Sequence, residues 1–70
     1  MGERLKSLRE AVSLTQGEFA EKLAVDANII EEAENGENEL TEQILFAICR
    51  QFNVNPQWLR SGRGKMFKER

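Results

Sequence analysis

Hydrophobic side chains return at helical spacing from the first residues of the chain. Leu5, Leu8 and Val12 stand at positions i, i+3 and i+7, a spacing that puts all three on one face of a helix. Basic side chains occupy the other side of this segment. The pattern predicts an amphipathic helix over residues 2–12.

The following segment carries the signature of a helix start. Thr15 and Glu18 are three residues apart, as the two members of a capping box must be. Leu14 and Phe19 flank this pair at the positions of a hydrophobic staple. The apolar face continues for about two turns, and the pattern predicts a helix over residues 15–23.

A tight turn and a second short helix are predicted next. Only two residues separate the first of these helices from Asp26, which is a residue type that caps helix starts well. From Asp26 to Glu34, the inward face is formed by Ile30 and Ala33. The Asn-Gly pair at positions 35 and 36 ends this helix, since both residue types tolerate the left-handed conformation.

The longest apolar pattern runs over residues 41–52. Ile44, Ile48 and Phe52 are spaced by four residues, and two further apolar residues widen the face that they form. Thr41 is the predicted cap of this segment. Because the segment is apolar around most of its circumference, we expect it to run through the centre of the domain.

A final short helix is predicted over residues 55–60. Asn55 is a favourable capping residue, and Pro56 fits the first helical position because its missing N–H needs no partner there. Trp58 and Leu59 form the inward face of this helix. A glycine-rich turn follows it.

These patterns predict an all-α fold of five helices with no strand. The 70 residues allow one domain, 1–70, with its core over about 3–60 and a basic C-terminal tail over 61–70. A domain of this size must use nearly every apolar residue that it has. The predicted core consists of Leu5, Leu8, Val12, Phe19, Ala20, Leu23, Val25, Ile30, Leu40, Ile44, Leu45, Ile48, Phe52, Trp58 and Leu59.

The chain also resembles a known family. The residues that carry the resemblance are Leu14-Thr15-Gln16, Phe19-Ala20-Glu21-Lys22-Leu23, Val25, Ile30 and Glu34-Asn35-Gly36. In this order and spacing they resemble the helix-turn-helix of phage repressors and Cro proteins, the XRE-like family, and the likeness extends over roughly residues 3 to 67. It implies a compact lambda-repressor-like DNA-binding domain, with the helix-turn-helix at the second and third predicted helices.

The resemblance implies a sequence-specific DNA-binding transcriptional regulator that acts on double-stranded DNA. In such proteins, the outward side chains of the second helix of the motif enter the major groove and read base edges. Carried over by position, the base-reading residues are Ala27, Asn28, Ile29, Glu31 and Glu32. The positions that hold phosphates in the family correspond to Gln16, Asn35 and Gly36.

The charge of the predicted reading helix favours other hypotheses. Residues 26–39 contain six acidic side chains and no lysine or arginine, in a chain whose net charge is −2. Contacts from lysine and arginine to phosphates supply most non-specific affinity for DNA. The alternative is a helix-turn-helix fold reused as a protein-interaction module, with its acidic helix against a basic partner. A toxin–antitoxin or prophage accessory component is a third hypothesis.

The basic residues gather at the other end of the chain. Half of the ten lysines and arginines stand among the last eleven residues, and they are Arg60, Arg63, Lys65, Lys68 and Arg70. Such a tail either lies along phosphates or is a solvated terminus. It cannot read a sequence.

Residues for catalysis or metal binding are missing from the chain. It has no histidine and one cysteine, which excludes a disulfide within the chain, a plausible zinc site and histidine-based catalysis. Cys49 stands in an apolar run and is expected to be buried. We therefore expect no enzyme, no cofactor and no metal. Without an apolar run long enough to span a membrane, we expect a cytoplasmic protein that makes no membrane contact.

Four apolar residues are the least needed in a monomeric core. Symmetric dimers use one surface patch twice, and two-fold regulators place two reading helices about one DNA turn apart. We therefore expect a homodimer. Its predicted contacts come from Phe46, Trp58, Met66 and Phe67.

Overall fold

The computed structural model describes residues 2–68 and consists of five helices joined by short connections. In chain order these are α1 (Gly2–Ala11), α2 (Gln16–Leu23), α3 (Ala27–Glu34), α4 (Glu42–Phe52) and α5 (Pro56–Ser61). Each helix begins and ends within one residue of its predicted bounds, and no strand forms within the described part of the chain. The prediction of an all-α fold is confirmed.

Helices α2 to α5 begin where side chains cap their free N–H groups. The Thr15 Oγ accepts a hydrogen bond from the N–H of Glu18 at 3.1 Å, and the Glu18 carboxylate accepts one from the N–H of Thr15 at 2.9 Å, which completes the capping box. Asp26, Thr41 and Asn55 each accept one N–H in the first turn of α3, α4 and α5. Because these caps have extended backbone, they precede the helices that were predicted to include them.

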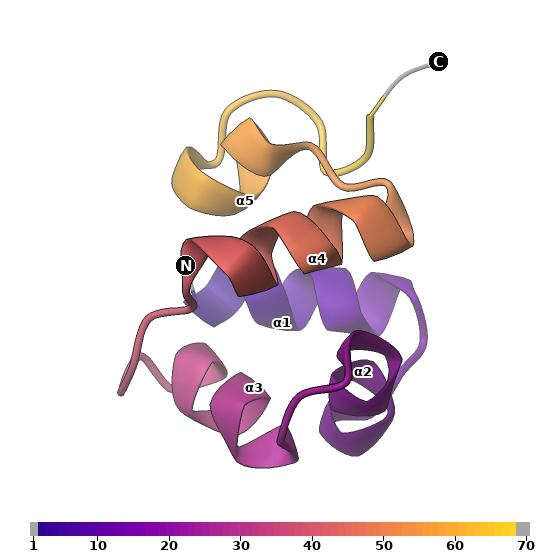
Figure 1. The fold of residues 1–70 in the computed structure, drawn as a ribbon. Coiled ribbons are helices and arrows are strands. Elements are labelled where there is room, and N and C mark those ends of the chain that lie inside the picture. Colours follow the sequence, from indigo (N-terminus) through magenta and orange to yellow (C-terminus); the bar gives the residue numbers. More distant parts are fainter. Residues whose placement is uncertain (1, 69–70) are drawn as a thin grey trace.

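The five helices form two ends and a middle (Figure 1). α4 and α1 occupy the middle, α5 covers one end, and α2 and α3 form the other end. α3 packs against both α2 and α1, and α4 packs against α2 and α5. The two helices of the expected helix-turn-helix therefore lie together, away from α5.

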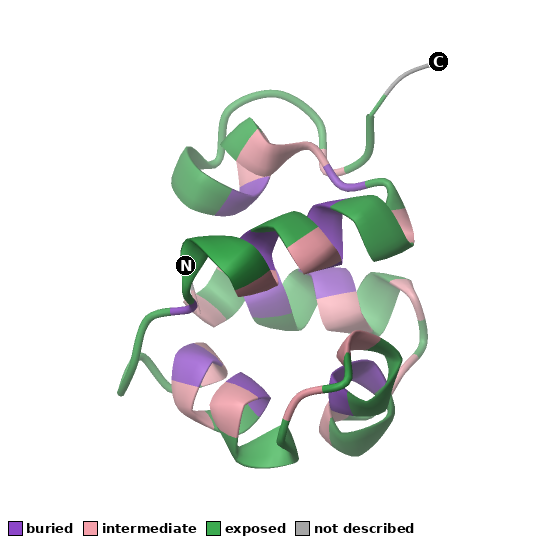
Figure 2. Cartoon of the chain, in the orientation of Figure 1, coloured by how far each residue is buried: buried purple, intermediate pink, exposed green. Residues whose placement is uncertain are grey.

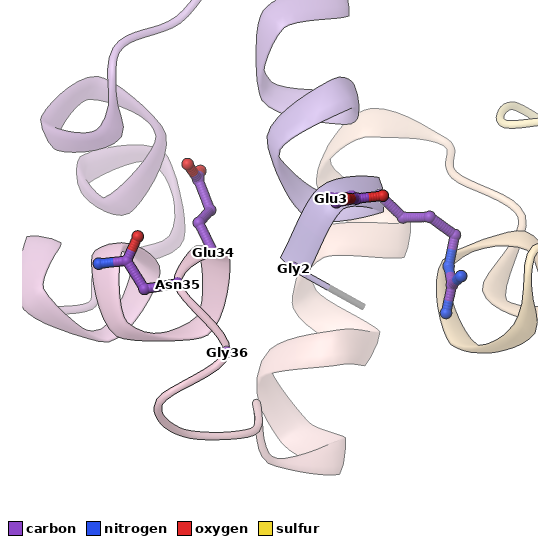
Figure 3. Close-up of a pocket in the computed structure, with 6 residues that line it drawn as sticks. Gly2, Glu3, Glu34, Asn35 and Gly36 are labelled. Carbon is purple, nitrogen blue, oxygen red and sulfur yellow. The ribbon is translucent and has the colours of Figure 1, made fainter.

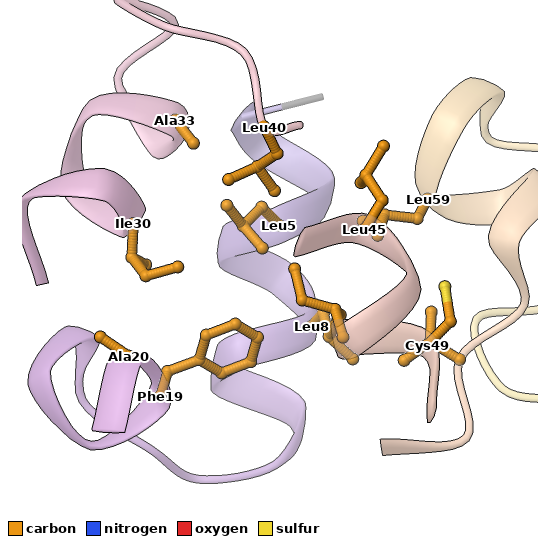
Figure 4. Packing of buried hydrophobic residues seen from close by; sticks show 12 residues of the cluster. Leu5, Leu8, Phe19, Ala20, Ile30, Ala33, Leu40, Leu45, Cys49 and Leu59 are labelled. Atoms are coloured by element: carbon orange, nitrogen blue, oxygen red, sulfur yellow. The ribbon is translucent and has the colours of Figure 1, made fainter. Parts of the chain in front are cut away.

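The core fills the space between these helices, and Figure 2 shows the buried positions on their inward faces. Leu5 and Leu8 of α1 meet Phe19, Ile30 and residues of α4 in one cluster (Figure 4). The ring of Phe19 also stacks on that of Phe52, with centroids 4.9 Å apart. The buried apolar residues are Leu5, Leu8, Phe19, Ala20, Ile30, Ala33, Leu40, Leu45, Ile48, Cys49, Val54 and Leu59.

The predicted core is confirmed at most positions and differs in degree at others. Val12, Leu23, Val25, Ile44, Phe52 and Trp58 are partly buried and pack against the cluster rather than inside it. Val54 was not predicted to be in the core, yet it is fully buried. It lies outside any helix, so helical periodicity does not identify it.

The C-terminal segment is held to the domain by hydrogen bonds between backbone groups. The N–H of Asn55 donates to the carbonyl of Met66 and the N–H of Lys68 donates to that of Asn53, both at 2.9 Å. These bonds form an isolated antiparallel bridge between Val54 and Phe67. Residues 62–68 are therefore a docked loop. Arg70, which was predicted to belong to the tail, lies outside the described residues.

The end of α3 differs from the prediction in one respect. Asn35 keeps right-handed helical backbone, with φ −81°, and only Gly36 takes the left-handed conformation, with φ 76°. The N–H of Asn35 still donates to the carbonyl of Glu31 at 3.0 Å, which holds it in the helical conformation. The glycine alone thus reverses the chain.

Residues 2–68 contain no helix of the length and apolar character needed to cross a bilayer.

Candidate nucleic-acid interface

The turn between α2 and α3 fixes how α3 crosses the domain. Ala24 ends α2 in the left-handed conformation, with φ 57°, although it is not a glycine. Its N–H donates to Glu21, and the N–H of Val25 donates to Ala20 at 3.0 Å. Asp26 then caps α3 by accepting the N–H of Asn28 at 3.0 Å. Both helix ends are thus satisfied within three residues, and α3 is held rigidly against α2.

Helix α3 has a buried face and an exposed face. Ile30 and Ala33 are buried in the core. Of the five predicted base-reading residues, Ala27, Asn28 and Glu31 are exposed. These three side chains are therefore accessible to a ligand, as a base-reading role requires.

The other two predicted base-reading residues are half-buried. Ile29 packs against the core, so only part of its side chain faces outward. A carboxylate oxygen of Glu32 accepts a hydrogen bond from Nδ2 of Asn38 at 3.0 Å. The carbonyl of Glu32 also accepts the N–H of Glu37 at 2.9 Å. Glu32 thus ties down the loop that follows α3 as well as facing the outer side.

An ion pair joins α1 to the last turn of α3. The Nε of Arg9 lies 2.7 Å from one carboxylate oxygen of Glu34, and its Nη2 lies 3.2 Å from the other. The side chains are only 14% and 4% exposed, respectively. The hydrogen bond to Glu34 raises the pKa of Arg9 above its ordinary value. Arg9 also donates to the carbonyl of Leu14 at 2.9 Å.

Sequence reasoning missed this pair, because it assigned Arg9 to the solvent side and counted Glu34 among uncompensated charges. A signal was present, since Arg9 stands four residues after Leu5 and Glu34 stands four residues after Ile30. Both charges therefore continue a buried helix face. Residues 26–39 carry six negative charges, and the positive charge of Arg9 compensates one of them. The net charge of this group together with Arg9 is therefore −5.

Gln16, a predicted phosphate ligand, belongs to the same cluster. Its Nε2 donates to the Glu34 carboxylate at 3.1 Å. A carboxylate accepts only, so this contact orients the amide with its nitrogen toward Glu34. The second N–H and the oxygen of Gln16 remain for other partners. The structure thus brings Gln16 and the end of α3 together.

Asn35 and Gly36, the other predicted phosphate ligands, line a shallow depression against the first turn of α1 (Figure 3). Its volume is about 410 Å³, and its walls also include Gly2, Glu3 and Glu34. The N–H of Gly36 donates to Ala33 at 3.3 Å and is therefore already engaged. The amide nitrogen of the Asn35 side chain donates to Glu37 at 3.2 Å and keeps a second N–H.

Gly2 allows the close approach of α1 that forms this depression. A Cβ at residue 2 would lie 2.5 Å from the carbonyl oxygen of Glu34, a distance that real Cβ atoms do not adopt. Within the described residues, no group of three or more carboxylate or cysteine side chains is arranged to hold a metal ion. The surface around α3 therefore offers polar and acidic side chains and no metal centre.

The predicted dimer residues differ in exposure. Phe46 is 58% exposed and Phe67 is 39% exposed. Trp58 and Met66 are half-buried and pack against the core of their own chain. Of these four residues, only the two phenylalanines are therefore exposed to a possible partner.

Comparison with known proteins agrees with this geometry. The sequence model of the helix-turn-helix family matches residues 5–59. The antitoxin PezA of Streptococcus pneumoniae serotype 4 (strain ATCC BAA-334 / TIGR4) is 36% identical over 55 residues, which make up 79% of this chain and 35% of that protein. This chain thus spans about a third of the length of that relative.

A solved structure shares the fold. The crystal structure of the restriction-modification controller protein C.AhdI from Aeromonas hydrophila matches with a TM-score of 0.75. The match covers 83% of this chain and 88% of the other, with 24% sequence identity. At this identity the likeness concerns the arrangement of the helices.

Proposed function

Because the chain belongs to the helix-turn-helix family, of the XRE type found in phage repressors and Cro proteins, we propose that it is a transcriptional regulator that recognises a specific sequence of double-stranded DNA. Members of this family are DNA-binding regulators and not enzymes.

The observation that carries the proposal is the exposed outer face of α3. Ala27, Asn28 and Glu31 point away from a helix whose other face is fixed in the core. The amide of Asn28 can pair with an adenine through two hydrogen bonds, and the methyl group of Ala27 can touch that of a thymine. Glu31 can accept a hydrogen bond from the amino group of a cytosine.

Ile29 and Glu32 have smaller roles in this proposal. The exposed part of Ile29 can contact a thymine methyl group at the edge of the interface. Glu32 has one carboxylate oxygen engaged by Asn38, and the other can accept from a cytosine amino group. We assign the main reading role to Asn28.

Phosphate contacts on either side of α3 set its register. The free N–H of Gln16 at the start of α2 and that of Asn35 after α3 are the proposed donors. Gly36 contributes by leaving room for a phosphate beside the depression. Such contacts position a protein on the duplex without reading its sequence.

We further propose that two copies associate through α4, with Phe46 at the centre of the contact. Phe46 is the most exposed large apolar residue of the described chain. Phe67 is a poorer centre, because basic residues surround it in the sequence and a two-fold contact would place like charges together. Sedimentation of Phe46→Ala should show less dimer than the wild type, whereas Phe67→Ala should behave as the wild type does.

The protein-interaction module remains a second candidate, and the acidic surface favours it. Asp26, Glu31, Glu37 and Glu39 are all exposed around α3 and its following loop. The similarity to a protein named as an antitoxin supports a setting in which the chain acts within a toxin–antitoxin pair, and a prophage accessory role stays open. In either case, the partner would present a basic surface to α3.

Selection from a random duplex library tests the main proposal. The wild type should enrich a defined sequence, and Asn28→Ala should lose discrimination at one base pair, by roughly 1–3 kcal/mol, in fluorescence anisotropy. Lys22→Gln, on the exposed side of α2, serves as the control for charge and fold. If no sequence is enriched and a basic protein partner binds the wild type instead, the second candidate replaces the first.

A further inference from the structure

The charges of this protein are separated along the chain. Residues 13–39 carry eight acidic side chains and one lysine, a net charge of −7. Residues 40–68 carry five basic side chains and one glutamate, a net charge of +4. The overall charge of −2 therefore conceals two regions of opposite sign.

The fold converts this separation into opposite ends of the molecule. α3 and α2 form one end and α5 with the following loop forms the other, while α1 and α4 lie between them (Figure 1). The domain measures 31 × 21 × 21 Å along its principal axes. Each of these lengths is at least about twice the Debye length of roughly 10 Å at 0.1 M salt, so exposed charges at opposite ends are largely screened from each other.

The basic end is an ordered surface. We call it the basic face and define it by Arg60, Arg63, Lys65 and Lys68. Backbone hydrogen bonds from Asn55 to Met66 and from Lys68 to Asn53 hold the end of the loop that follows α5. On the other side, the Nε and Nη2 of Arg4 donate to the carbonyls of Leu59 and Arg60, at 3.0 and 2.8 Å, and hold the end of α5.

The only described acidic residue on α4 or beyond it is Glu42, and it pairs with Arg60. This hydrogen bond raises the pKa of Arg60. Burial raises the pKa of the Cys49 thiol, and the positive charges of Lys68 and Arg60 partly oppose this rise. Arg63 and Lys68 are both exposed.

We propose that the basic face binds the phosphates of duplex DNA without reading sequence, and that it supplies the non-specific affinity that the acidic surface of α3 cannot supply. The inference rests on the proposed function for its choice of DNA as the polyanion. A dense, regular row of phosphates attracts clustered lysines and arginines through counterion release. Duplex DNA is favoured over a single strand because the face carries only one exposed aromatic residue, Phe67, for base stacking.

The geometry implies that one copy touches two stretches of DNA. A straight duplex held by α3 lies at the far end from the basic face, so the basic face must hold a second segment. The protein would thereby bridge two duplexes, or two parts of one bent duplex. Specific reading and non-specific holding would reside at opposite ends of one small domain.

The test compares two double variants that remove the same charge. Arg63→Gln with Lys68→Gln alters the basic face, and Lys6→Gln with Lys22→Gln removes two exposed lysines from α1 and α2. The loop should stay docked in the first variant, because its hydrogen bonds use the backbone of Arg63 and Lys68. Circular dichroism at rising temperature checks that all variants fold alike.

Binding of a mixed-sequence duplex is then measured by anisotropy at several salt concentrations. For the basic-face variant, the slope of log K against log salt should become shallower by about 1.8, which is about 0.9 for each lost phosphate contact. The control variant should keep the slope of the wild type. Equal slopes in the two variants would overturn the proposal, as would a wild type that binds no mixed-sequence duplex at low salt.

Further measurements distinguish this proposal from the proposed reading role of α3. Failure of the wild type to enrich a defined sequence would contradict the proposed function, whereas a shallower salt slope in the basic-face variant would still support this proposal. Loss of mixed-sequence binding in Asn28→Ala but not in the basic-face variant would overturn the proposal. If the protein binds single-stranded DNA more tightly than duplex DNA, and Phe67→Ala weakens that binding, the basic face binds single strands instead. If it captures polyglutamate in preference to DNA, the basic face binds an acidic polypeptide instead. Retention of a fluorescent duplex on beads that carry a second duplex, lost in the basic-face variant, would support bridging.

Discussion

Arg9 and Glu34 meet across the contact of α1 and α3 through two hydrogen bonds, of 2.7 and 3.2 Å, and both side chains are almost wholly shielded from water. The same carboxylate accepts a hydrogen bond from Gln16. One charged group therefore joins the first helix, the start of α2 and the last turn of α3. Its loss affects the fold and the proposed DNA contacts together.

Removing Arg9 alone should strongly destabilise the domain. Arg9→Met leaves the Glu34 carboxylate buried without its partner, and the expected cost is roughly 3–5 kcal/mol in urea unfolding. The double variant Arg9→Met with Glu34→Leu should recover much of this loss, because two apolar groups need no partner. Arg50→Met, at an exposed site on α4, is the control. A double variant no more stable than Arg9→Met would show that the pair does more than satisfy its own charges.

The capping box at α2 predicts a dependence of stability on pH. The hydrogen bond from the N–H of Thr15 lowers the pKa of Glu18 in the folded state. The stability from this carboxylate is therefore present above the ordinary pKa of glutamate, about 4.3, and is lost as pH falls through the lowered pKa. Unfolding of the wild type and Glu18→Gln should differ at neutral pH and converge in acid. Parallel curves for the wild type and Glu18→Gln would contradict the prediction.

Glu31 should oppose the binding of the selected operator. Of the two predicted base-reading carboxylates on α3, Glu31 is exposed and Glu32 is half-buried. A like charge at about 4 Å in water costs roughly 1 kcal/mol, so Glu31→Gln should bind the selected duplex several-fold more tightly at low salt. The gain should shrink as salt rises. Glu10→Gln, exposed on α1, is the control, and a variant that loses discrimination at one base pair instead would identify Glu31 as a reader of cytosine.

Truncation of a core residue should cost far more than truncation of Phe46. Ile48 is fully buried at the centre of α4, and Ile48→Ala should cost roughly 2–5 kcal/mol. A domain this small has little stability to lose, so the variant should be largely unfolded at moderate temperature. Phe46→Ala, two residues away on the same helix, should unfold almost as the wild type does. Thermal melts followed by circular dichroism give both values.

The helices could be predicted from the sequence because their causes are local. A cap such as Thr15 lies within three residues of the N–H that it accepts. The spacing of Ile44, Ile48 and Phe52 likewise lies within a single segment. The resemblance to a known family added how these helices are arranged, and the core followed from both.

Features that depend on two distant segments were not predicted. The Arg9–Glu34 pair joins residues 25 positions apart, and nothing in either segment alone names the other. The bridge of Val54 with Phe67 relies on backbone groups that every sequence provides. The left-handed Ala24 was also missed, because alanine seldom adopts this conformation and the tertiary fold imposes it here. The roles of Asn28, Gln16 and Asn35 toward DNA stay predictions.

The missing side chain at residue 2 affects how α3 is presented to a ligand. Helix ends carry partial charges, and the positive start of α1 here abuts the negative end of α3. Each macrodipole therefore partly neutralises the other at the contact. Since a Cβ at residue 2 would collide with the carbonyl of Glu34, even alanine there would push the end of α3 away from α1. The tilt of the proposed reading helix, and so the angle at which it would enter a groove, therefore depends on Gly2 having a hydrogen atom in place of a side chain, next to the C-terminal end of α3.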